Sequence, residues 1–299
     1  MIEIARILCP VDFSKPSRAA LEAALTLARW YGAQVSVPHV VQVALPPAPF
    51  AAEPPFVLTP ALHADTLDHL HQFIAECSPG AVPVSASALA GAPVAEILGL
   101  ADSLPADLIV IGTHGRSGFE HLLMGSVAER VLRKAACPVC TVREADASRP
   151  HTPPAPFQNV LCAVDFSPAA GNALAYALSV AQESGGRLTL VHAQDWPLDV
   201  RASEVLGADA ARYQRQLHDR AARELAAAVP AEARTWCRIE EVVSIGRPHE
   251  VVLQTARDMA ADLIVMGVHG RFGLDLHVLG STTDRVVREA ACPVLTVRR

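Results

Sequence analysis

Residues 106–126, ADLIVIGTHGRSGFEHLLMGS, return as residues 261–281, ADLIVMGVHGRFGLDLHVLGS, with 12 of 21 positions identical. Each copy begins with the apolar, β-branched run of a buried strand and continues into a loop that contains glycines. Each ends in a Gly-Ser pair, which suits the beginning of a helix whose N-terminus favours anions. Between 106–143 and 261–298, 23 of 38 positions are identical. The stretch therefore predicts a strand, a loop and a helix, and it predicts them twice.

The duplication reaches the beginning of each half. The segment RILCPVDFS at 6–14 is matched by NVLCAVDFS at 159–167. A length of 299 residues suits two domains of roughly 150 residues each. We predict one domain at 1–143 and a second at 157–299, joined by a linker at 144–156 that contains four prolines.

Apolar strand patterns and helical patterns alternate in both halves, which predicts an α/β fold. We expect each domain to be a five-stranded, doubly wound parallel sheet with helices on both faces. Helices are expected at 16–31 and from Pro93 and Pro248, with Gly32 and Gly185 as left-handed caps after the first helix of each domain. Strands are expected at 4–11, 34–41, 82–89, 107–111 and 138–142, and in the second half at 187–193, 239–244, 262–266 and 293–297.

Composition and charge exclude several classes of function. The formal net charge is −6 and no block of like charges occurs, so the basic surface of a nucleic-acid-binding protein is missing. No apolar run reaches the about 18–20 residues of a membrane helix. The first residues read as a strand and not as a signal peptide. We expect a cytoplasmic protein that binds neither nucleic acid nor membrane.

Seven cysteines lie mostly in apolar runs, which is typical of reduced, buried thiols. Cys137 and Cys140 form a C-x-x-C pair, but the pair leads into a strand, where positions three apart point to opposite faces. The second copy has Leu295 in place of Cys140, so no second pair completes a zinc site. We expect no disulfide and no metal site.

The glycine spacing G-x2-G-x9-G-S is the motif that carries chemistry, and it occurs once in each half. Glycines let backbone N–H groups approach a phosphate without interference from a Cβ atom. The motif is not a Walker sequence, because no lysine follows the last glycine. The alternative is that the glycines only form turns. The residues of the motif are Gly112, Gly115, Gly125 and Ser126 in the first half, and Gly267, Gly270, Gly280 and Ser281 in the second.

This spacing, after a strand ending in Ala-Asp-Leu-Ile-Val and before Cys-Pro-Val, resembles the ATP-binding branch of the universal stress protein family. The resemblance covers both halves except 45–60 and 144–156. It implies flavodoxin-like domains, a role in the stress response, and ATP as ligand, with or without Mg²⁺. It also implies that Asp12 and Val40 hold the adenosine in the first half and Asp165 and Ala193 in the second, while the glycines and the final serine hold the phosphates.

Several of these residues have a second interpretation. Asp12 and Asp165, taken alone, would be read as helix caps or turns. His114 and His269 lie inside the phosphate loop, where they either donate to a phosphate or are solvated. Pro38 stands where the second half has Val191, and it removes a ladder donor, which predicts a weaker first site.

Three functions are compatible with the sequence. The first is a binding module in which ATP controls association with protein partners that the sequence does not identify. The second is slow ATP hydrolysis or phosphoryl transfer, although no convincing general base is present and we assign no catalytic residue. The third is an interaction protein with empty sites. We also expect the two copies to pack as a pseudo-two-fold dimer through their fifth strands, and two chains could associate further.

Overall fold

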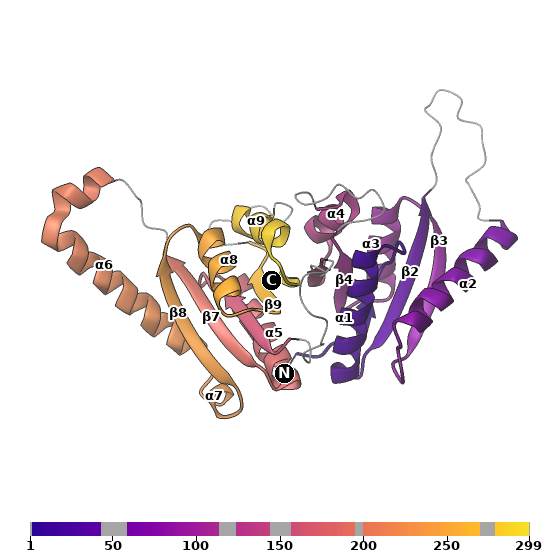
Figure 1. The fold of residues 1–299 in the computed structure, drawn as a ribbon, viewed down its shortest axis with the longest axis horizontal. Coiled ribbons are helices and arrows are strands. Elements are labelled where there is room, and N and C mark those ends of the chain that lie inside the picture. Colours follow the sequence, from indigo (N-terminus) through magenta and orange to yellow (C-terminus); the bar gives the residue numbers. More distant parts are fainter. Residues whose placement is uncertain are drawn as a thin grey trace, which may run out of the picture. The chain divides into compact units, whose positions relative to one another are not determined.

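The computed structural model describes residues 2–42, 59–113, 124–143, 157–194, 200–269 and 279–298, and for residues 200–211 it describes the backbone only. The chain divides into two compact units, Glu3–His151 and Thr152–Arg299, the second of which also includes Met1–Ile2. We call them domain one and domain two and describe each by itself (Figure 1). The predicted linker and nearly all of the proline-rich segment 45–60 lie outside the described residues.

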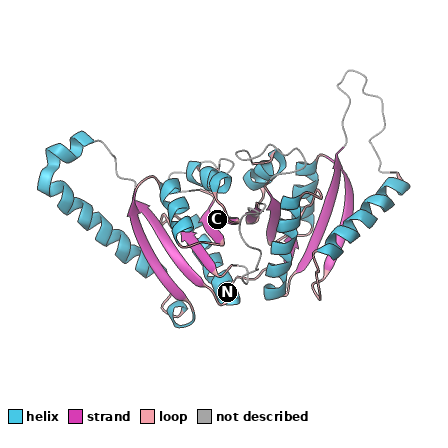
Figure 2. Cartoon of the chain, viewed as in Figure 1, coloured by secondary structure: helices cyan, strands magenta, loops and turns pink. Residues whose placement is uncertain are grey.

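Domain one contains a parallel sheet with the strand order β3-β2-β1-β4-β5. Its helices α1 and α2 lie on one face, where Arg18 donates to Glu76, and α3 and α4 pack against each other on the other. Figure 2 shows the helices flanking the strands. The elements are β1 (Arg6–Leu8), α1 (Lys15–Tyr31), β2 (Gln34–Gln42), α2 (Pro60–Glu76), β3 (Val84–Gly91), α3 (Pro93–Ser103), β4 (Leu108–Gly112), α4 (Ser126–Lys134) and β5 (Val139–Val142).

Domain two repeats this topology with the order β8-β7-β6-β9-β10. The predicted five-stranded, doubly wound parallel sheet is therefore confirmed in both halves. The elements are β6 (Asn159–Ala163), α5 (Pro168–Ser184), β7 (Arg187–Gln194), α6 (Val200–Ala228), α7 (Ala233–Trp236), β8 (Arg238–Ile245), α8 (Pro248–Asp258), β9 (Leu263–Gly267), α9 (Ser281–Glu289) and β10 (Val294–Val297).

The first helix of each domain begins and ends as the sequence predicts. Ser14 caps α1 by accepting a hydrogen bond from the Ser17 backbone N–H. Gly32 ends the same helix with φ of 65°, a left-handed conformation that glycine adopts without a Cβ penalty. In domain two, Ser167 and Gly185 have the same roles. The predicted helices from Pro93 and Pro248 are also present.

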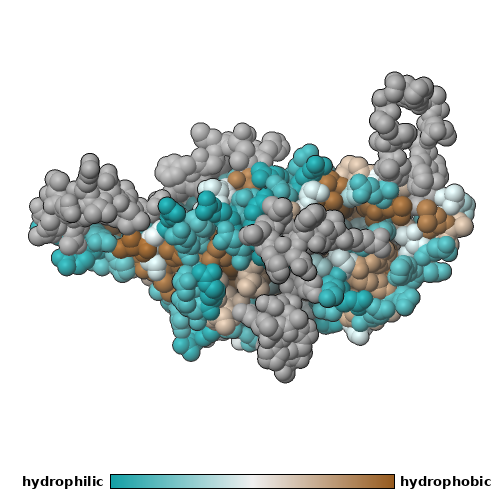
Figure 3. Space-filling view, turned by 45° about the horizontal axis from the view of Figure 1, so that its top comes forward, coloured by the Kyte–Doolittle hydropathy of each residue, from teal (hydrophilic) through white to brown (hydrophobic). Residues whose placement is uncertain are grey.

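The cores lie under these first helices. Leu21 and Leu25 of α1 are fully buried, and so are Ile109 and Val110 of β4, against which the helix packs. Burying each of these side chains contributes about 1.5–3 kcal/mol relative to leaving it in water. None of the described helices is long and apolar enough to cross a membrane. The surface drawn in Figure 3 is a mixture of hydrophilic and hydrophobic areas.

The first strand of domain one is shorter than the predicted 4–11. β1 pairs with β2 only from Arg6 to Leu8, whereas β6 of domain two pairs with β7 from Asn159 to Ala163. Pro38 occupies the position of Val191 and has no N–H to donate to β1, although its carbonyl still accepts from Val11. On the other side of the strand, Pro10 has no N–H to donate to β4. The two prolines therefore end the ladder early on both sides of β1.

The aspartate before the fourth strand has a structural role that the sequence did not predict. Asp107 accepts hydrogen bonds from the backbone N–H groups of Ala5 and Arg6, both at Oδ2. Asp262 accepts from Gln158 at Oδ2 and from Asn159 at Oδ1. Burial raises the pKa of Asp262 despite these bonds. This part of the repeated motif fixes the first strand at the end of the sheet opposite the glycines.

Candidate functional site

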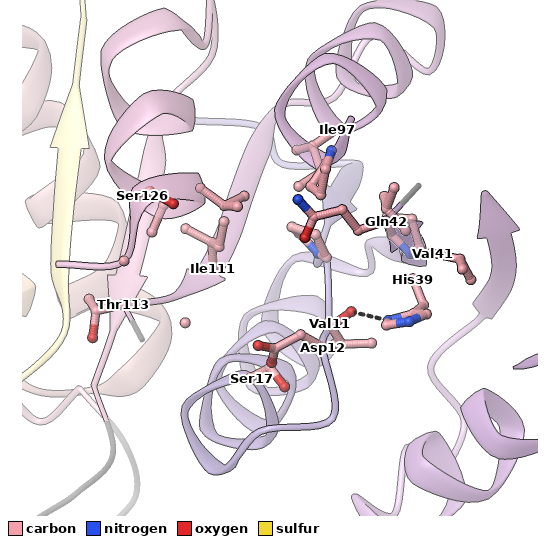
Figure 4. Close-up of a pocket in the computed structure, with 18 residues that line it drawn as sticks. Val11, Asp12, Ser17, His39, Val41, Gln42, Ile97, Ile111, Thr113 and Ser126 are labelled. Atoms are coloured by element: carbon pink, nitrogen blue, oxygen red, sulfur yellow. Dashed lines mark hydrogen bonds between the residues drawn. The ribbon is translucent and has the colours of Figure 1, made fainter. Parts of the chain in front are cut away.

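Domain one has a cavity of about 590 Å³ at the carboxyl ends of its strands (Figure 4). The chain leaves β1 toward β2 and β3, and later returns to β4 on the other side of β1. The crevice between β1 and β4 is thus the switch point of the sheet, where doubly wound folds bind ligands. The volume is in the range of small-molecule pockets. The residues that line it include Pro10, Val11, Asp12, Ser17, Pro38, His39, Val40, Gln42, Pro93, Ile97, Gly112, Thr113, Gly125, Ser126 and Ala128.

Asp12 lies in the turn between β1 and α1, and it lines the cavity. Its Oδ1 accepts hydrogen bonds from the Ser14 N–H (3.1 Å) and from the Ser14 hydroxyl (2.5 Å). Asp165 accepts in the same way from the Ser167 N–H at 3.0 Å. The helix cap itself is the serine, so the capping interpretation of the aspartates was wrong. The turn interpretation is correct, and it leaves the Asp12 carboxylate facing the cavity.

The residue after Asp12 holds this turn in an uncommon backbone conformation. Phe13 has φ of 65° and Phe166, its counterpart, has φ of 61°. A non-glycine residue in the left-handed region is uncommon and needs support from its surroundings. The Phe13 ring packs against the rings of His39 and His69, with distances between ring centroids of 4.4 Å and 4.8 Å. These contacts hold the Asp12 turn in place.

His39 of β2 and His192 of β7 are half-buried and stand at matched positions of the two halves. Each also makes a hydrogen bond that the sequence analysis missed. Nδ1 of His39 lies 2.8 Å from the Val11 carbonyl, and Nδ1 of His192 lies 2.7 Å from the Val164 carbonyl. Because a carbonyl only accepts, the proton is on Nδ1. The two histidines tie the second strand to the end of the first.

Gly112 is the first glycine of the motif, and it touches the first turn of α1. A Cβ atom there would lie 2.8 Å from the Pro16 carbonyl carbon and 2.9 Å from the Ser17 nitrogen. At Gly267 a Cβ atom would lie 3.0 Å from Cβ of Ala169. Both glycines are therefore required by the close approach of a helix to the strand. This structural reason is independent of any ligand.

Gly125 and Gly280 precede the last helix of each domain. The Gly125 N–H donates to the Thr113 carbonyl at 2.5 Å, and the Gly280 N–H donates to the Val268 carbonyl at 3.1 Å. Ser126 and Ser281 are the first residues of α4 and α9. The beginning of α4 lines the cavity, where the positive end of the helix dipole favours an anionic group.

The remaining predicted residues divide into two groups. Val40 lines the cavity near the end of β2, and Ala193 has the equivalent place in β7. His269 follows β9 and is half-buried. His114, Gly115 and Gly270 lie outside the described residues, so their predicted contacts with phosphate remain predictions.

One wall of the cavity, formed by α3 and by Gln42 at the end of β2, was not predicted from the sequence. Pro93 and Ile97 of α3 line it, and Figure 4 shows the Gln42 side chain pointing into it. Gly91, the last residue of β3, has φ of 151°, and Gly246, directly after β8, has φ of 149°. The signal was a second repeated pattern, Gly-x-Pro, at Gly91 and again at Gly246.

The described lining of the cavity includes the Asp12 carboxylate and no lysine or arginine. Phosphates in this cavity would therefore be met by backbone N–H groups and helix N-termini within the described part of the wall. Such groups attract anions without a side-chain cation.

Cys137 and Cys140 are free thiols, like the other five cysteines. Cys140 is buried in β5, and burial raises the pKa of Cys137 to about 11. Burial also raises the pKa of Cys162 to about 12. The described residues include no cluster of three histidines, cysteines or carboxylates that could hold a metal ion. The raised pKa values keep the Cys137 and Cys162 thiols protonated, and therefore unreactive, at neutral pH.

Comparisons with known proteins agree with this architecture. The model of the universal stress protein family matches residues 3–143 and 156–298. Universal stress protein Rv2005c of Mycobacterium tuberculosis is 34% identical over 194 residues, which cover 65% of this chain but only 62% of that protein. A universal stress protein of Mycolicibacterium smegmatis is 28% identical over 300 residues, covering 98% and 96% of the two chains. The crystal structure of a universal stress protein from Archaeoglobus fulgidus has a TM-score of 0.66, covers 98% of both chains at 23% identity, and shows the fold alone.

Proposed function

The chain belongs to the universal stress protein family, and from this premise we propose that it is an ATP-binding stress-response protein of the cytoplasm. ATP occupies the crevice at the carboxyl end of each sheet and controls association with protein partners. Mg²⁺ accompanies the phosphates. The two domains pack as a pseudo-two-fold dimer, and two chains associate further into a homodimer.

One observation carries the proposal: the cavity at the switch point of domain one brings together residues that the sequence placed far apart. Asp12 comes from the turn after β1, Gly112 from the end of β4, and Gly125 and Ser126 from the beginning of α4. An acidic acceptor on one side and a helix N-terminus on the other suit a ligand with hydroxyl groups at one end and phosphates at the other. ATP has this polarity.

Binding is favoured over hydrolysis by the chemistry of the described wall. Oδ1 of Asp12 accepts two hydrogen bonds from Ser14, so this oxygen holds the turn in place and is not free to take a proton from a water. A regulatory site needs only differential binding between two arrangements of the protein.

The experiment that tests this function is mass spectrometry of nucleotide carried through native purification, followed by isothermal titration with ATP and GTP at physiological Mg²⁺. We expect up to two ATP molecules per chain and weaker binding of GTP. Measuring phosphate release over the same period separates binding from turnover. The proposal fails if no nucleotide co-purifies and ATP produces no heat.

A further inference from the structure

The second helices of the two domains carry charges of opposite sign. α2 contains three carboxylates and neither lysine nor arginine, which gives −3 with its histidines neutral. Residues 212–228 of α6, whose side chains the structure describes, contain four arginines and two carboxylates, which gives +2. The two copies of this helix therefore differ in charge as well as in length.

The register of the duplication shows where the charges are reversed. Leu70 of α2 and Leu225 of α6 are both fully buried, and each lies 21 residues before the matched glycine, Gly91 or Gly246. Counted from these leucines, the matched pairs are Leu62 with Leu217, Asp65 with Arg220, and Asp68 with Arg223. We call Leu62, Asp65 and Asp68 the α2 ridge, and Leu217, Arg220 and Arg223 the α6 ridge. The two ridges have the same spacing and opposite charges.

The charged side chains of both ridges lie on the outer side of their helices. On α2 the buried side chains of Leu70, Phe73 and Ile74 face the sheet. At 3.6 residues per turn, Asp65 and Asp68 point away from them, and both are exposed. The two arginines of the α6 ridge are exposed as well. Both ridges are thus accessible to another protein molecule.

These charges are largely unpaired within their own chain. Among the described residues, no ion pair of Asp65, Asp68 or Arg223 is present. Arg220 contacts Glu224 at 2.8 Å, yet 72% of its side chain remains exposed. Like charges one turn apart on a helix repel each other. Two opposite charges from another molecule would relieve this repulsion in either ridge.

We propose that the α2 ridge of one chain docks on the α6 ridge of a second copy of this chain. Two α2 ridges would bring carboxylates against carboxylates, and two α6 ridges would bring arginines against arginines, whereas α2 with α6 pairs opposite charges. Leu62, which is 39% exposed, supplies an apolar contact beside the ion pairs. The inference rests on the homodimer of the proposed function and is independent of ATP.

The strength of this contact should depend on salt. An exposed ion pair contributes little by itself and is screened by added ions, so two such pairs give a weak, salt-sensitive association. Sedimentation equilibrium of the full chain, at about 50 mM and about 500 mM NaCl, measures it. We expect the association constant of the parent to fall about tenfold at the higher salt.

Charge reversal tests which ridges meet. The α2 variant carries Asp65→Arg and Asp68→Arg, and the α6 variant carries Arg220→Glu and Arg223→Glu. Each should self-associate about tenfold more weakly than the parent, because its two ridges then have the same sign. The formal net charge changes from −6 to −2 in the α2 variant, since each change adds two units, so general repulsion alone would predict stronger association. The chain with all four changes should associate like the parent, and so should an equimolar mixture of the two variants.

Asp102→Arg is the control, because it reverses an exposed charge on α3 outside both ridges and should leave association unchanged. Circular dichroism verifies folding, and the salt dependence of the parent requires no variant. If the chains associate equally in the parent and in both variants, or if the four changes together do not restore what each pair lost, the inference is overturned and the homodimer stands. Loss in the α2 variant alone would mean that α2 meets a different surface, which also overturns it. A parent that stays monomeric removes both the inference and the homodimer, while ATP binding is decided by its own titration.

Discussion

The two domains have the same strand order and differ where the first strand meets the candidate site. In domain two, β6 pairs with β9 from Val160 to Ala163, whereas β1 pairs with β4 only at Ile7 and Leu8. Pro10 has no N–H to donate to β4, and Pro38 of β2 has none to donate to β1; both prolines line the cavity of domain one. The same topology therefore forms even where the first strand stops pairing early beside the site, because the buried part of the ladder is kept.

The second helix marks another difference between the domains. α2 has 17 residues, and α6 has 29. Phe73 of α2 stacks edge-on with Phe13 at 5.5 Å, so this helix helps to hold the turn that contains Asp12. The two domains therefore differ in the length of the second helix, which in domain one contacts the turn that contains Asp12.

The largest effect should follow from giving domain two the proline of domain one. Val191→Pro removes an N–H that faces β6 and leaves a buried carbonyl without a donor, which costs about 3 kcal/mol of unfolding free energy. Chemical denaturation measures the cost, and hydrogen exchange should show faster exchange at the end of β6. Val191→Ala is the control, since it loses packing but keeps the donor. Equal exchange in both variants would contradict the role of the missing N–H.

A somewhat smaller effect is expected where α1 touches β4. Gly112→Ala places a Cβ atom 2.8 Å from backbone atoms of Pro16, and backbone cannot move aside as a side chain can. We expect a loss of about 1–3 kcal/mol in thermal or chemical unfolding. Gly267→Ala is the matched change, and its 3.0 Å approach to Cβ of Ala169 should make it milder. A reversed order would mean that α5 is held more rigidly than α1.

The aspartates before the fourth strands should respond differently to neutral substitution. Both oxygens of Asp262 accept a backbone N–H, so in Asp262→Asn one of these N–H donors would face the NH₂ group of the amide, which is also a donor. We expect a loss of about 1–2 kcal/mol of unfolding free energy. Asp107 accepts both bonds at Oδ2, and Asp107→Asn keeps an oxygen there, so its cost should be less than about 1 kcal/mol. Urea unfolding of both variants gives the comparison.

The cost of Asp262→Asn should also depend on pH. Burial raises the pKa of Asp262 in the folded protein, so its contribution to stability is full below the ordinary aspartate pKa. This contribution falls as the pH rises through the raised value. The parent should therefore exceed Asp262→Asn in stability by more at pH 4 than at pH 7. A difference that grows toward pH 7 would contradict the raised pKa.

The smallest effect is expected for Pro38→Val, which restores the donor that domain two has. The hydrogen bond gained is offset by the greater freedom of the unfolded chain, so unfolding free energy should change by less than about 1 kcal/mol. Slower hydrogen exchange at the end of β1 is the sharper measurement. Unchanged exchange would indicate that Pro10 alone ends the ladder.

Local patterns in the sequence determined the fold. The alternation of apolar strands with helical repeats and the glycine caps Gly32 and Gly185 depend on neighbours within a few residues, and their consequences could be predicted. Taken alone, Asp12 and Asp165 would be read as the helix N-caps, whereas the structure shows Ser14 and Ser167 in that role. The duplication supported each prediction with a second example. Several of the predicted site residues line one cavity, because the carboxyl ends of parallel strands meet at one edge of the sheet, and their contact with a ligand stays a prediction.

Only the tertiary structure decided why particular residues stand at that edge. Gly112 was interpreted through phosphate, but its contact with Pro16 depends on how closely a helix crosses a strand that is distant in sequence. The acceptor of the Thr283 hydroxyl is the carbonyl of Gly267, which no periodicity connects with it. The ladder ends early because Pro10, just after β1, has no N–H to donate to β4, and Pro38 of β2 has none to donate to β1; both effects depend on the register of the strands. A sequence pattern predicts which face of a helix or strand a residue occupies. A contact between segments that are distant in sequence is fixed only when packing of the layers brings the two segments together.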